Sequence, residues 1–193
     1  MHHSFHRYLV RLLLLRGETN VRIVDLHPPS NELKSHASVS FIKADITSLQ
    51  SVRDALTEPF TTSGAPPTVI FHTAATIRFW ERLSYCWNAS YQVNVVGTEN
   101  VIRVAKELPS VTLIYTSTAD VVVPCPKLLR LGWDVPKDYK PVVNESLPPH
   151  LHDTGGCYSR TKLLAERRIA DADGQGGLRT GIIRPGLWVM LSE

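Results

Sequence analysis

Short apolar runs alternate with longer amphipathic segments along the chain. The apolar runs cover residues 21–25, 39–45, 69–75, 111–118 and 180–184, and each is typical of a strand buried on both faces. Apolar residues recur at helical spacing in residues 7–16, 47–56, 83–108 and about 156–170. This alternation predicts an α/β fold, a doubly wound parallel sheet of the Rossmann type, formed by one domain of 193 residues.

Turn-forming residues separate these segments. Gly17 is a natural stop for the first helix, and Thr47 or Ser48 is suited to cap the second. Prolines and mixed polarity from 124 to 152 predict a long irregular insertion, and 171–177 is expected to form a turn.

Polar or small residues stand where several predicted strands end, namely Asp25, Asp45, 72–75 and 116–118. In doubly wound sheets, ligands bind beyond the carboxyl ends of the strands, so this coincidence predicts a site there. Two carboxylates have alternative roles that need no ligand. Asp25 is also suited to cap a turn or helix, and Asp45 to be the N-cap of the helix that follows.

Tyr158 and Lys162 are four residues apart in a predicted helix, so both side chains lie on one helical face. A nearby ammonium lowers the pKa of a phenol, which makes Tyr158 a candidate general acid/base. The alternative is an exposed tyrosine beside a solvated lysine, because the same spacing is common on amphipathic helices.

Composition narrows the function classes. A net charge of +3, dispersed along the chain, argues against a nucleic-acid partner. Apolar runs are too short for a transmembrane segment, and we predict no targeting signal. Three widely spaced cysteines without a metal-ligand pattern favour a reducing compartment and predict no metal site.

Seven short motifs together resemble one enzyme family. The chain is similar to the extended short-chain dehydrogenases/reductases (the NAD-dependent epimerase/dehydratase superfamily), and more closely to their branch of 3β-hydroxysteroid dehydrogenases and sterol-4α-carboxylate 3-dehydrogenases. The motifs occur in the family's order: Val24-Asp25-Leu26, Ala44-Asp45-Ile46, Phe71-His72-Thr73-Ala74-Ala75, Val93-Asn94-Val95-Val96-Gly97-Thr98, Tyr115-Thr116-Ser117-Thr118, Tyr158-Ser159-Arg160-Thr161-Lys162 and Arg184-Pro185-Gly186.

The resemblance implies hydride transfer between a 3-hydroxyl group of a steroid or sterol and NAD. Tyr158 is expected to take the alcohol proton, while Lys162 holds the nicotinamide ribose and lowers the pKa of Tyr158. Thr118, with Ser117 as the alternative, is expected to hydrogen-bond the reacting oxygen.

Further residues are implied to bind or support the cofactor. Asp25 is expected at the adenine-side ribose, and Asp45 with Ile46 at the adenine edge. The other expected contacts are the backbone of His72, Thr73, Ala74 and Ala75, the support residue Asn94, and Pro185 near the nicotinamide.

The chain departs from the family pattern at both ends. The first family strand is absent, and Met1, His3 and His6 align with the three glycines that let a helix N-terminus meet the pyrophosphate. The sequence stops at Glu193, before the family's smaller substrate-binding lobe. We therefore expect an incomplete member of the family that binds NAD poorly.

Two other functions fit the same motifs. One is a nucleotide-sugar epimerase or dehydratase, or a dihydroflavonol-type reductase, and the other is a non-catalytic remnant. The resemblance also suggests a homodimer formed by the long helix and the Tyr158 helix. It suggests a location in the cytoplasm or peripherally at the endoplasmic reticulum membrane.

Overall fold

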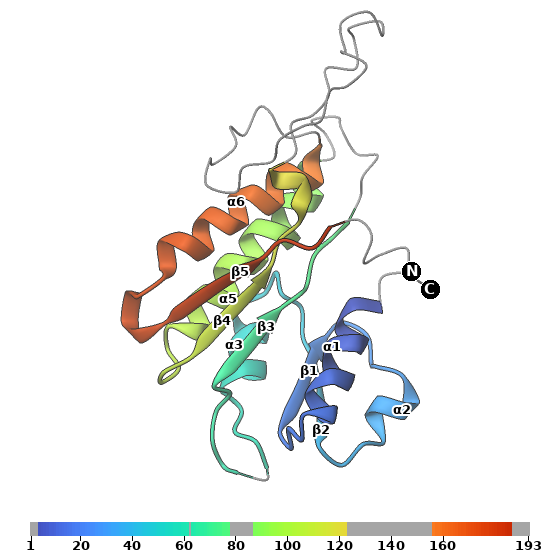
Figure 1. Ribbon diagram of the computed structural model, residues 1–193. Coiled ribbons are helices and arrows are strands. Elements are labelled where there is room, and N and C mark those ends of the chain that lie inside the picture. Colours follow the sequence, from blue (N-terminus) through green and yellow to red (C-terminus); the bar gives the residue numbers. More distant parts are fainter. Residues whose placement is uncertain (1–3, 62, 78–86, 123–155, 187–193) are drawn as a thin grey trace, which may run out of the picture.

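The secondary structure follows the predicted alternation. The structure is a computed structural model that describes residues 4–61, 63–77, 87–122 and 156–186 (Figure 1). Its strands are β1 (Val21–Asp25), β2 (Val39–Lys43), β3 (Val69–His72), β4 (Thr112–Thr116) and β5 (Arg179–Ile183). Its α-helices are α1 (Ser4–Leu15), α2 (Asn31–Lys34), α3 (Leu49–Thr57), α4 (Trp87–Tyr91), α5 (Gly97–Ala105) and α6 (Cys157–Ala172). A π-helix (Gln92–Val96) joins α4 to α5, and 3₁₀ turns cover Ala119–Val121 and Gln175–Gly177.

The strands form two parallel sheets. β1 pairs with β2, starting at Val21 opposite Val39, and the second sheet has the order β3-β4-β5. β1 and β3 lie beside each other but are not paired (Figure 1). The predicted parallel α/β fold is confirmed.

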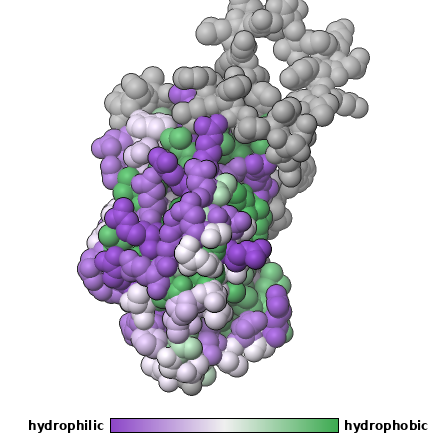
Figure 2. Space-filling view, turned by 90° about the vertical axis from the view of Figure 1, so that its left-hand side faces the viewer, coloured by the Kyte–Doolittle hydropathy of each residue, from purple (hydrophilic) through white to green (hydrophobic). Residues whose placement is uncertain are grey.

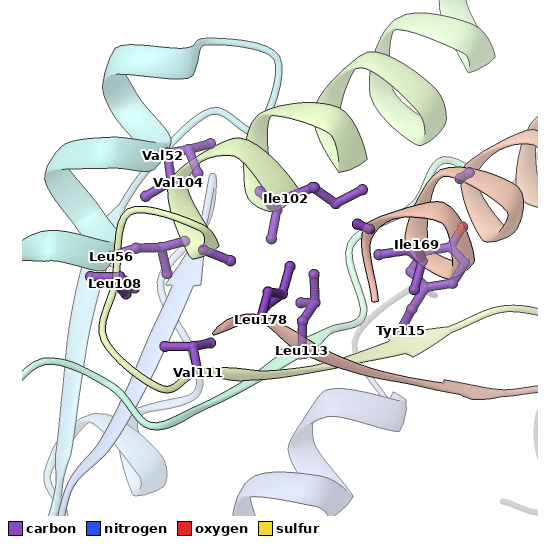
Figure 3. Close-up of a cluster of buried hydrophobic side chains, with 14 residues drawn as sticks. Val52, Leu56, Ile102, Val104, Leu108, Val111, Leu113, Tyr115, Ile169 and Leu178 are labelled. Carbon is purple, nitrogen blue, oxygen red and sulfur yellow. The ribbon is translucent and has the colours of Figure 1, made fainter. Parts of the chain in front are cut away.

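The main core lies between β3-β4-β5 and the helices α3, α5 and α6 (Figure 3). Val104, Leu113 and Ile169 are fully buried there, and burial of one such side chain stabilises the fold by about 1.5–3 kcal/mol. Within the described residues, the opposite face of this sheet is less covered, because Val69 and Ile183 remain 47% and 48% exposed. The side of the molecule at the left of Figure 1 is largely hydrophilic (Figure 2).

A smaller core joins α1, β1 and α2. Its buried residues are Val10, Val21, Ile23 and Leu33. The helix stop predicted at Gly17 is confirmed: this residue has φ = +86°, and its N–H donates to the Leu14 carbonyl at 3.0 Å. The Glu18 N–H donates to the Leu13 carbonyl at 3.1 Å, which completes a Schellman motif.

Several element boundaries differ from the prediction. The strand expected over 39–45 ends at Lys43, because Asp45 folds the chain into a turn by accepting the Thr47 N–H at 2.9 Å. The strand from Val69 ends at His72, and the last strand begins one residue early, at Arg179. The strand expected over 111–118 covers Thr112–Thr116.

The helices also differ in detail. Ser48 is confirmed as the N-cap of α3, since its hydroxyl accepts the Ser51 N–H. The short helix α2 follows the two prolines where a loop was expected. The helix expected over 83–108 contains a π-helical turn and ends at Ala105; residues 83–86 lie outside the described part, as does the insertion expected over 124–152. No helix in the described ranges is long and apolar enough to cross a membrane.

Candidate active site

The side chains of Tyr158 and Lys162 are buried one turn apart on α6. Their residues are 6% and 1% exposed, so the alternative of a surface tyrosine beside a solvated lysine is wrong. The helix begins after Gly156, which has an extended backbone. It packs against α5 and the carboxyl end of β4, where the structure gathers most of the predicted catalytic residues.

The ammonium of Lys162 is directed at β4. It donates a hydrogen bond to the Thr116 carbonyl and lies 4.2 Å from the ring centroid of Tyr115, within the range of a cation–π contact. Burial lowers the pKa of Lys162 to about 7, and the Glu166 carboxylate opposes this shift. Lys162 is thus close to losing its charge at neutral pH.

The expected lowering of the Tyr158 pKa is wrong for this structure. Burial, followed by the charge of Asp120, raises the pKa of Tyr158 to about 12. A hydrogen bond with Thr118 acts in the opposite direction but is too weak to reverse the shift. The reason is geometric: Lys162 turns its ammonium to the Thr116 carbonyl, so burial dominates at the phenol.

The structure distinguishes between the two candidate hydroxyls. Thr118 hydrogen-bonds Tyr158, and its Oγ1 accepts the Asp120 N–H at 3.3 Å, which leaves its own proton to donate. Ser117 is buried, and its hydroxyl has no hydrogen-bond partner among the residues that the structure describes. The geometry favours Thr118 as the hydroxyl that works with Tyr158.

Asn94 connects the loop after β3 with α6. Its Nδ2 donates to the Thr76 carbonyl at 3.1 Å and to the Thr161 hydroxyl at 3.0 Å, and its Oδ1 accepts the Thr76 N–H at 2.7 Å. Asn94 lies in the π-helical turn, a distortion that is frequent at functional sites. Asn94 therefore fixes the loop and the helix turn that carries Lys162, instead of being an ordinary helix-interior asparagine.

His72 is a buried, neutral residue. Its Nε2 is 2.8 Å from the Thr98 hydroxyl, and its ring lies 5.3 Å from the Tyr115 ring, centroid to centroid. Burial, with a smaller effect of Lys162, lowers the pKa of His72 to about 3. The side chain is thus part of the core, and the backbone contacts expected for His72, Thr73, Ala74 and Ala75 stay a prediction.

Backbone hydrogen bonds hold the loops after β4 and β5 together. The Ser117 N–H donates to the Ile183 carbonyl at 2.7 Å, and the Ala119 N–H donates to the Pro185 carbonyl at 3.0 Å. Arg184 forms two hydrogen bonds with the carboxylate of Glu166, at 2.5 and 3.2 Å. Pro185 therefore lies close to the loop that follows Thr118, which is compatible with its expected position.

Sequence reasoning missed four residues of this arrangement. These are Thr161, Glu166, Asp120 and Arg184. The position of Glu166, four residues after Lys162 on the same helix, was a signal that it faces the same space. No pattern in the sequence pointed to Asp120, because its effect on Tyr158 depends on how two separate loops meet.

The expected adenine-side residues lie on the other sheet. Asp25 ends β1, and its Oδ1 accepts the His27 N–H at 2.9 Å, as the turn-capping alternative requires. Asp45 accepts the Thr47 N–H at 2.9 Å and the Thr47 hydroxyl at 2.8 Å, but the N-cap of α3 is Ser48, so that alternative is wrong. Ile46 packs against Gly97, where a Cβ would meet its side chain at 2.9 Å.

Comparisons with known proteins agree on a family. Residues 27–192 match the NAD-binding family model described as male sterility protein. Human short-chain dehydrogenase/reductase family 42E member 1 is 32% identical over 179 residues, which are 89% of this chain and 40% of that protein. Rat 3 beta-hydroxysteroid dehydrogenase type 7 is 32% identical over 185 residues, 90% of this chain and 47% of that protein. The chain thus spans less than half the length of these relatives.

Solved structures show the same fold. The UDP-glucose 4-epimerase of Thermus thermophilus in complex with NAD has a TM-score of 0.65 at 22% identity, covering 92% of this chain and 50% of that one. MoeE5 in complex with UDP-glucuronic acid and NAD has a TM-score of 0.62 at 23% identity, with the same two coverages. Taken with the family match, the chain belongs to the extended short-chain dehydrogenase/reductase family, on the branch of the 3β-hydroxysteroid dehydrogenases.

Proposed function

We propose that this chain carries the catalytic residues for NAD-dependent oxidation of a 3β-hydroxysteroid or sterol. The observation that carries the proposal is the buried Tyr158, hydrogen-bonded to Thr118 and one helical turn from the buried Lys162. The relatives named as 3 beta-hydroxysteroid dehydrogenases support the substrate class.

The residues present are suited to bind the adenine-side ribose and the nicotinamide side of NAD, but not the pyrophosphate between them. Asp25 stands at the carboxyl end of β1, where it is suited to accept hydrogen bonds from the adenine-side ribose. Tyr158 and Lys162 are suited to the nicotinamide side. A pyrophosphate needs close backbone approach at a helix N-terminus, yet the first glycine of the chain is Gly17, beyond the end of α1. We therefore propose weak NAD binding by this polypeptide alone.

Bound NAD+ supplies the hydride acceptor for the alcohol carbon. The chain's own residues handle the proton. Thr118 donates a hydrogen bond that orients the alcohol oxygen near Tyr158, and Tyr158 accepts the proton as a phenolate. With a pKa of about 12, Tyr158 is almost entirely protonated at neutral pH, so a facing cation must stabilise its phenolate. Charged Lys162 is the candidate cation once its ammonium turns from the Thr116 carbonyl to the phenol, and Glu166 favours that charge.

A second candidate function is that of a nucleotide-sugar epimerase. The similarity to the UDP-glucose 4-epimerase fold favours it, and the same tyrosine and lysine are suited to move a proton on a sugar hydroxyl. A homodimer through α5 and α6, and a location in the cytoplasm or on the endoplasmic reticulum surface, stay predictions that accompany the steroid proposal.

Substrate assays on a longer protein that contains this chain distinguish the two functions. NADH formation is measured with a panel of 3β-hydroxysteroids, and UDP-sugars, whose epimerisation yields no net NADH, are followed by analysis of the product sugars. The proposal predicts NADH formation with a steroid, whereas turnover of UDP-sugars alone favours the epimerase. For the present chain, calorimetric titration with NAD+ is expected to show no tight binding, and a micromolar affinity would contradict this expectation.

Asp25 provides a matched test of cofactor choice. Its carboxylate repels the 2′-phosphate of NADP, so the longer protein is expected to prefer NAD. Asp25→Asn removes the charge and keeps the turn-capping oxygen. The preference for NAD over NADP is expected to fall about tenfold, as for the loss of one close charge interaction. An unchanged preference refutes the role of Asp25.

A further inference from the structure

The ammonium of Lys162 has an aromatic neighbour that the proposed proton transfer does not use. This neighbour is Tyr115 of β4, whose ring centroid lies 4.2 Å from the Lys162 Nζ. Burial alternates along β4, with Leu113 and Tyr115 as its buried residues, so Tyr115 points to the face of the sheet that α6 covers. A ring face, and not only the backbone carbonyl of Thr116, thus contacts the candidate cation.

The ring of Tyr115 is held in place from several sides. The His72 ring of β3 lies 5.3 Å away, inclined by 50°. Val104 of α5 and Ile169 of α6 belong to the same buried cluster, and Figure 3 shows Tyr115 next to Ile169. Because Tyr115 is 0% exposed in this close packing, its ring cannot turn its face away from Lys162 without opening the core.

The Tyr115 ring offers a π face and not a charge. Burial, followed by the negative charges of the Tyr158 phenolate and of Glu166, raises the pKa of Tyr115 well above its usual range, so its phenol stays neutral. The face of a neutral ring carries partial negative charge and attracts a cation, most strongly where water is excluded. Lys162 is buried, so water screens this attraction little.

The buried ammonium needs such support. The hydrogen bond to the Thr116 carbonyl uses one of the three N–H groups of Lys162, and one neutral carbonyl does not replace the water that a cation loses on burial. The Glu166 carboxylate favours the charge from one turn away, but its oxygens are bonded to Arg184. The Tyr115 ring therefore adds stabilisation from β4 without placing a second carboxylate in the core.

The other titratable groups near Lys162 do not take this role at neutral pH. His72 of β3 is neutral above its pKa of about 3, and Tyr158 of α6 is neutral below its pKa of about 12. Asp120, after β4, acts on Tyr158. Glu166 and the aromatic ring are thus the described groups that favour the charged lysine.

We propose that Tyr115 is a positioning residue for Lys162: its ring face holds the ammonium at the end of β4 and keeps it charged there. Tyr115 itself exchanges no proton. A charged lysine is thereby ready for the Tyr158 phenolate, a consequence that rests on the proposed function. The contact and its effect on the lysine do not depend on that function and can be tested in the present chain.

A series of fluorinated phenylalanines at position 115 tests the proposal at nearly constant shape. Fluorine withdraws electron density from the ring face, so each added fluorine weakens a cation–π contact. The pKa of Lys162 is measured by NMR titration of its side chain in the 193-residue chain. From about 7, this pKa is expected to change little in Tyr115→Phe and to fall by about one pH unit when three fluorines are added to that ring. The absence of any fall with fluorine number overturns the proposal, because a merely structural ring predicts no trend.

Phe71 provides the matched control. His72 pairs with Tyr115 across β3 and β4, so both side chains point to the α6 side, and Phe71 points to the opposite face of the same sheet. Trifluorophenylalanine at position 71 is expected to leave the pKa of Lys162 unchanged. An equal fall for positions 71 and 115 contradicts the proposal, since the effect would then not come from the ring beneath the ammonium.

The unaltered chain gives a measurement that does not depend on how a variant folds. A nuclear Overhauser effect is expected between the Tyr115 ring protons and the Lys162 methylene next to the ammonium, since the Nζ lies 4.2 Å from the ring centroid. Absence of this signal overturns the contact on which the proposal depends.

Activity in a longer protein that contains this chain separates this proposal from the proposed function. If charged Lys162 is needed, the loss of kcat at high pH is expected to begin about one pH unit lower with the trifluorinated ring at position 115 than with Tyr115→Phe. An unchanged pH profile in an active protein contradicts the role of Tyr115. If the unaltered longer protein oxidises no steroid, the proposed function fails, and the titration of Lys162 still decides on Tyr115.

Discussion

Glu166 and Arg184 form an ion pair that joins α6 to the end of β5. Replacing Glu166 by glutamine removes the negative charge of this pair while keeping the size of the side chain. The Glu166 and Arg184 side chains are only 8% and 20% exposed, and two hydrogen bonds connect them. Loss of one partner from a buried pair costs about 3–5 kcal/mol because the other charge loses its counter-ion. Arg184 keeps some contact with water, so we expect a loss of about 3 kcal/mol.

The chain contains a matched exposed pair. Arg53 and Glu107 form the same two-pronged contact, at 3.0 and 2.8 Å, but their side chains are 33% and 42% exposed. Solvent screens an exposed pair of this kind, so Glu107→Gln is expected to destabilise the fold far less than Glu166→Gln.

Urea unfolding followed by circular dichroism measures both free energies. With a denaturant slope of about 2 kcal/mol/M, Glu166→Gln is expected to lower the midpoint by about 1.5 M and Glu107→Gln by far less. Equal losses would refute the reasoning that burial makes the Glu166–Arg184 pair important. NMR titration of Lys162 gives a second result: its pKa is expected to fall further below about 7 in Glu166→Gln, because that carboxylate raises it.

Three further substitutions test the packing around the site. The pKa of His72 is about 3 in the fold and 6.5 without perturbation, so the unfolded chain binds more protons between these pH values. The free energy of unfolding is therefore expected to fall by up to about 1.4 kcal/mol per pH unit below 6.5. His72→Gln is expected to lose this pH dependence, as urea titrations at several pH values measure. Gly97→Ala is expected to cost about 1–2 kcal/mol by crowding Ile46, and to become neutral or stabilising in an Ile46→Ala background, as thermal melting measures. Asn94→Ala is expected to cost about 2–4 kcal/mol by calorimetry, since it leaves the backbone of Thr76 without its side-chain partner; a loss below about 1 kcal/mol would argue against its role as a connector.

Local sequence signals predicted the fold well where one interaction decides the structure. The Gly17 stop and the Ser48 cap each depend on a few neighbouring residues, and both are confirmed. The alternation of apolar runs similarly indicated the parallel sheet. The early end of the strand at Lys43 was missed, because it depends on an Asp45 turn that competes with the ladder.

The pairing of two candidate residues was predictable, but several neighbours of that pair and the electrostatics around it were not. Spacing placed Tyr158 and Lys162 on one helical face, but spacing does not say where a flexible lysine directs its ammonium. Contact with the Thr116 carbonyl is a tertiary effect, and it explains why burial raises the pKa of Tyr158 when a decrease was expected. The π-helical turn that places Asn94 was not visible in the helical pattern either.

The central claim is that Tyr158 exchanges the proton during alcohol oxidation. It is tested by the rate of NADH formation from a 3β-hydroxysteroid, comparing Tyr158→Phe with the unaltered sequence in a longer protein that contains this chain. Tyr91→Phe, in α4, is the control for loss of a hydroxyl elsewhere. The account predicts that Tyr158→Phe lowers kcat by about 10²–10⁴-fold and that Tyr91→Phe changes it little. Equal rates for Tyr158→Phe and the unaltered protein would contradict the account.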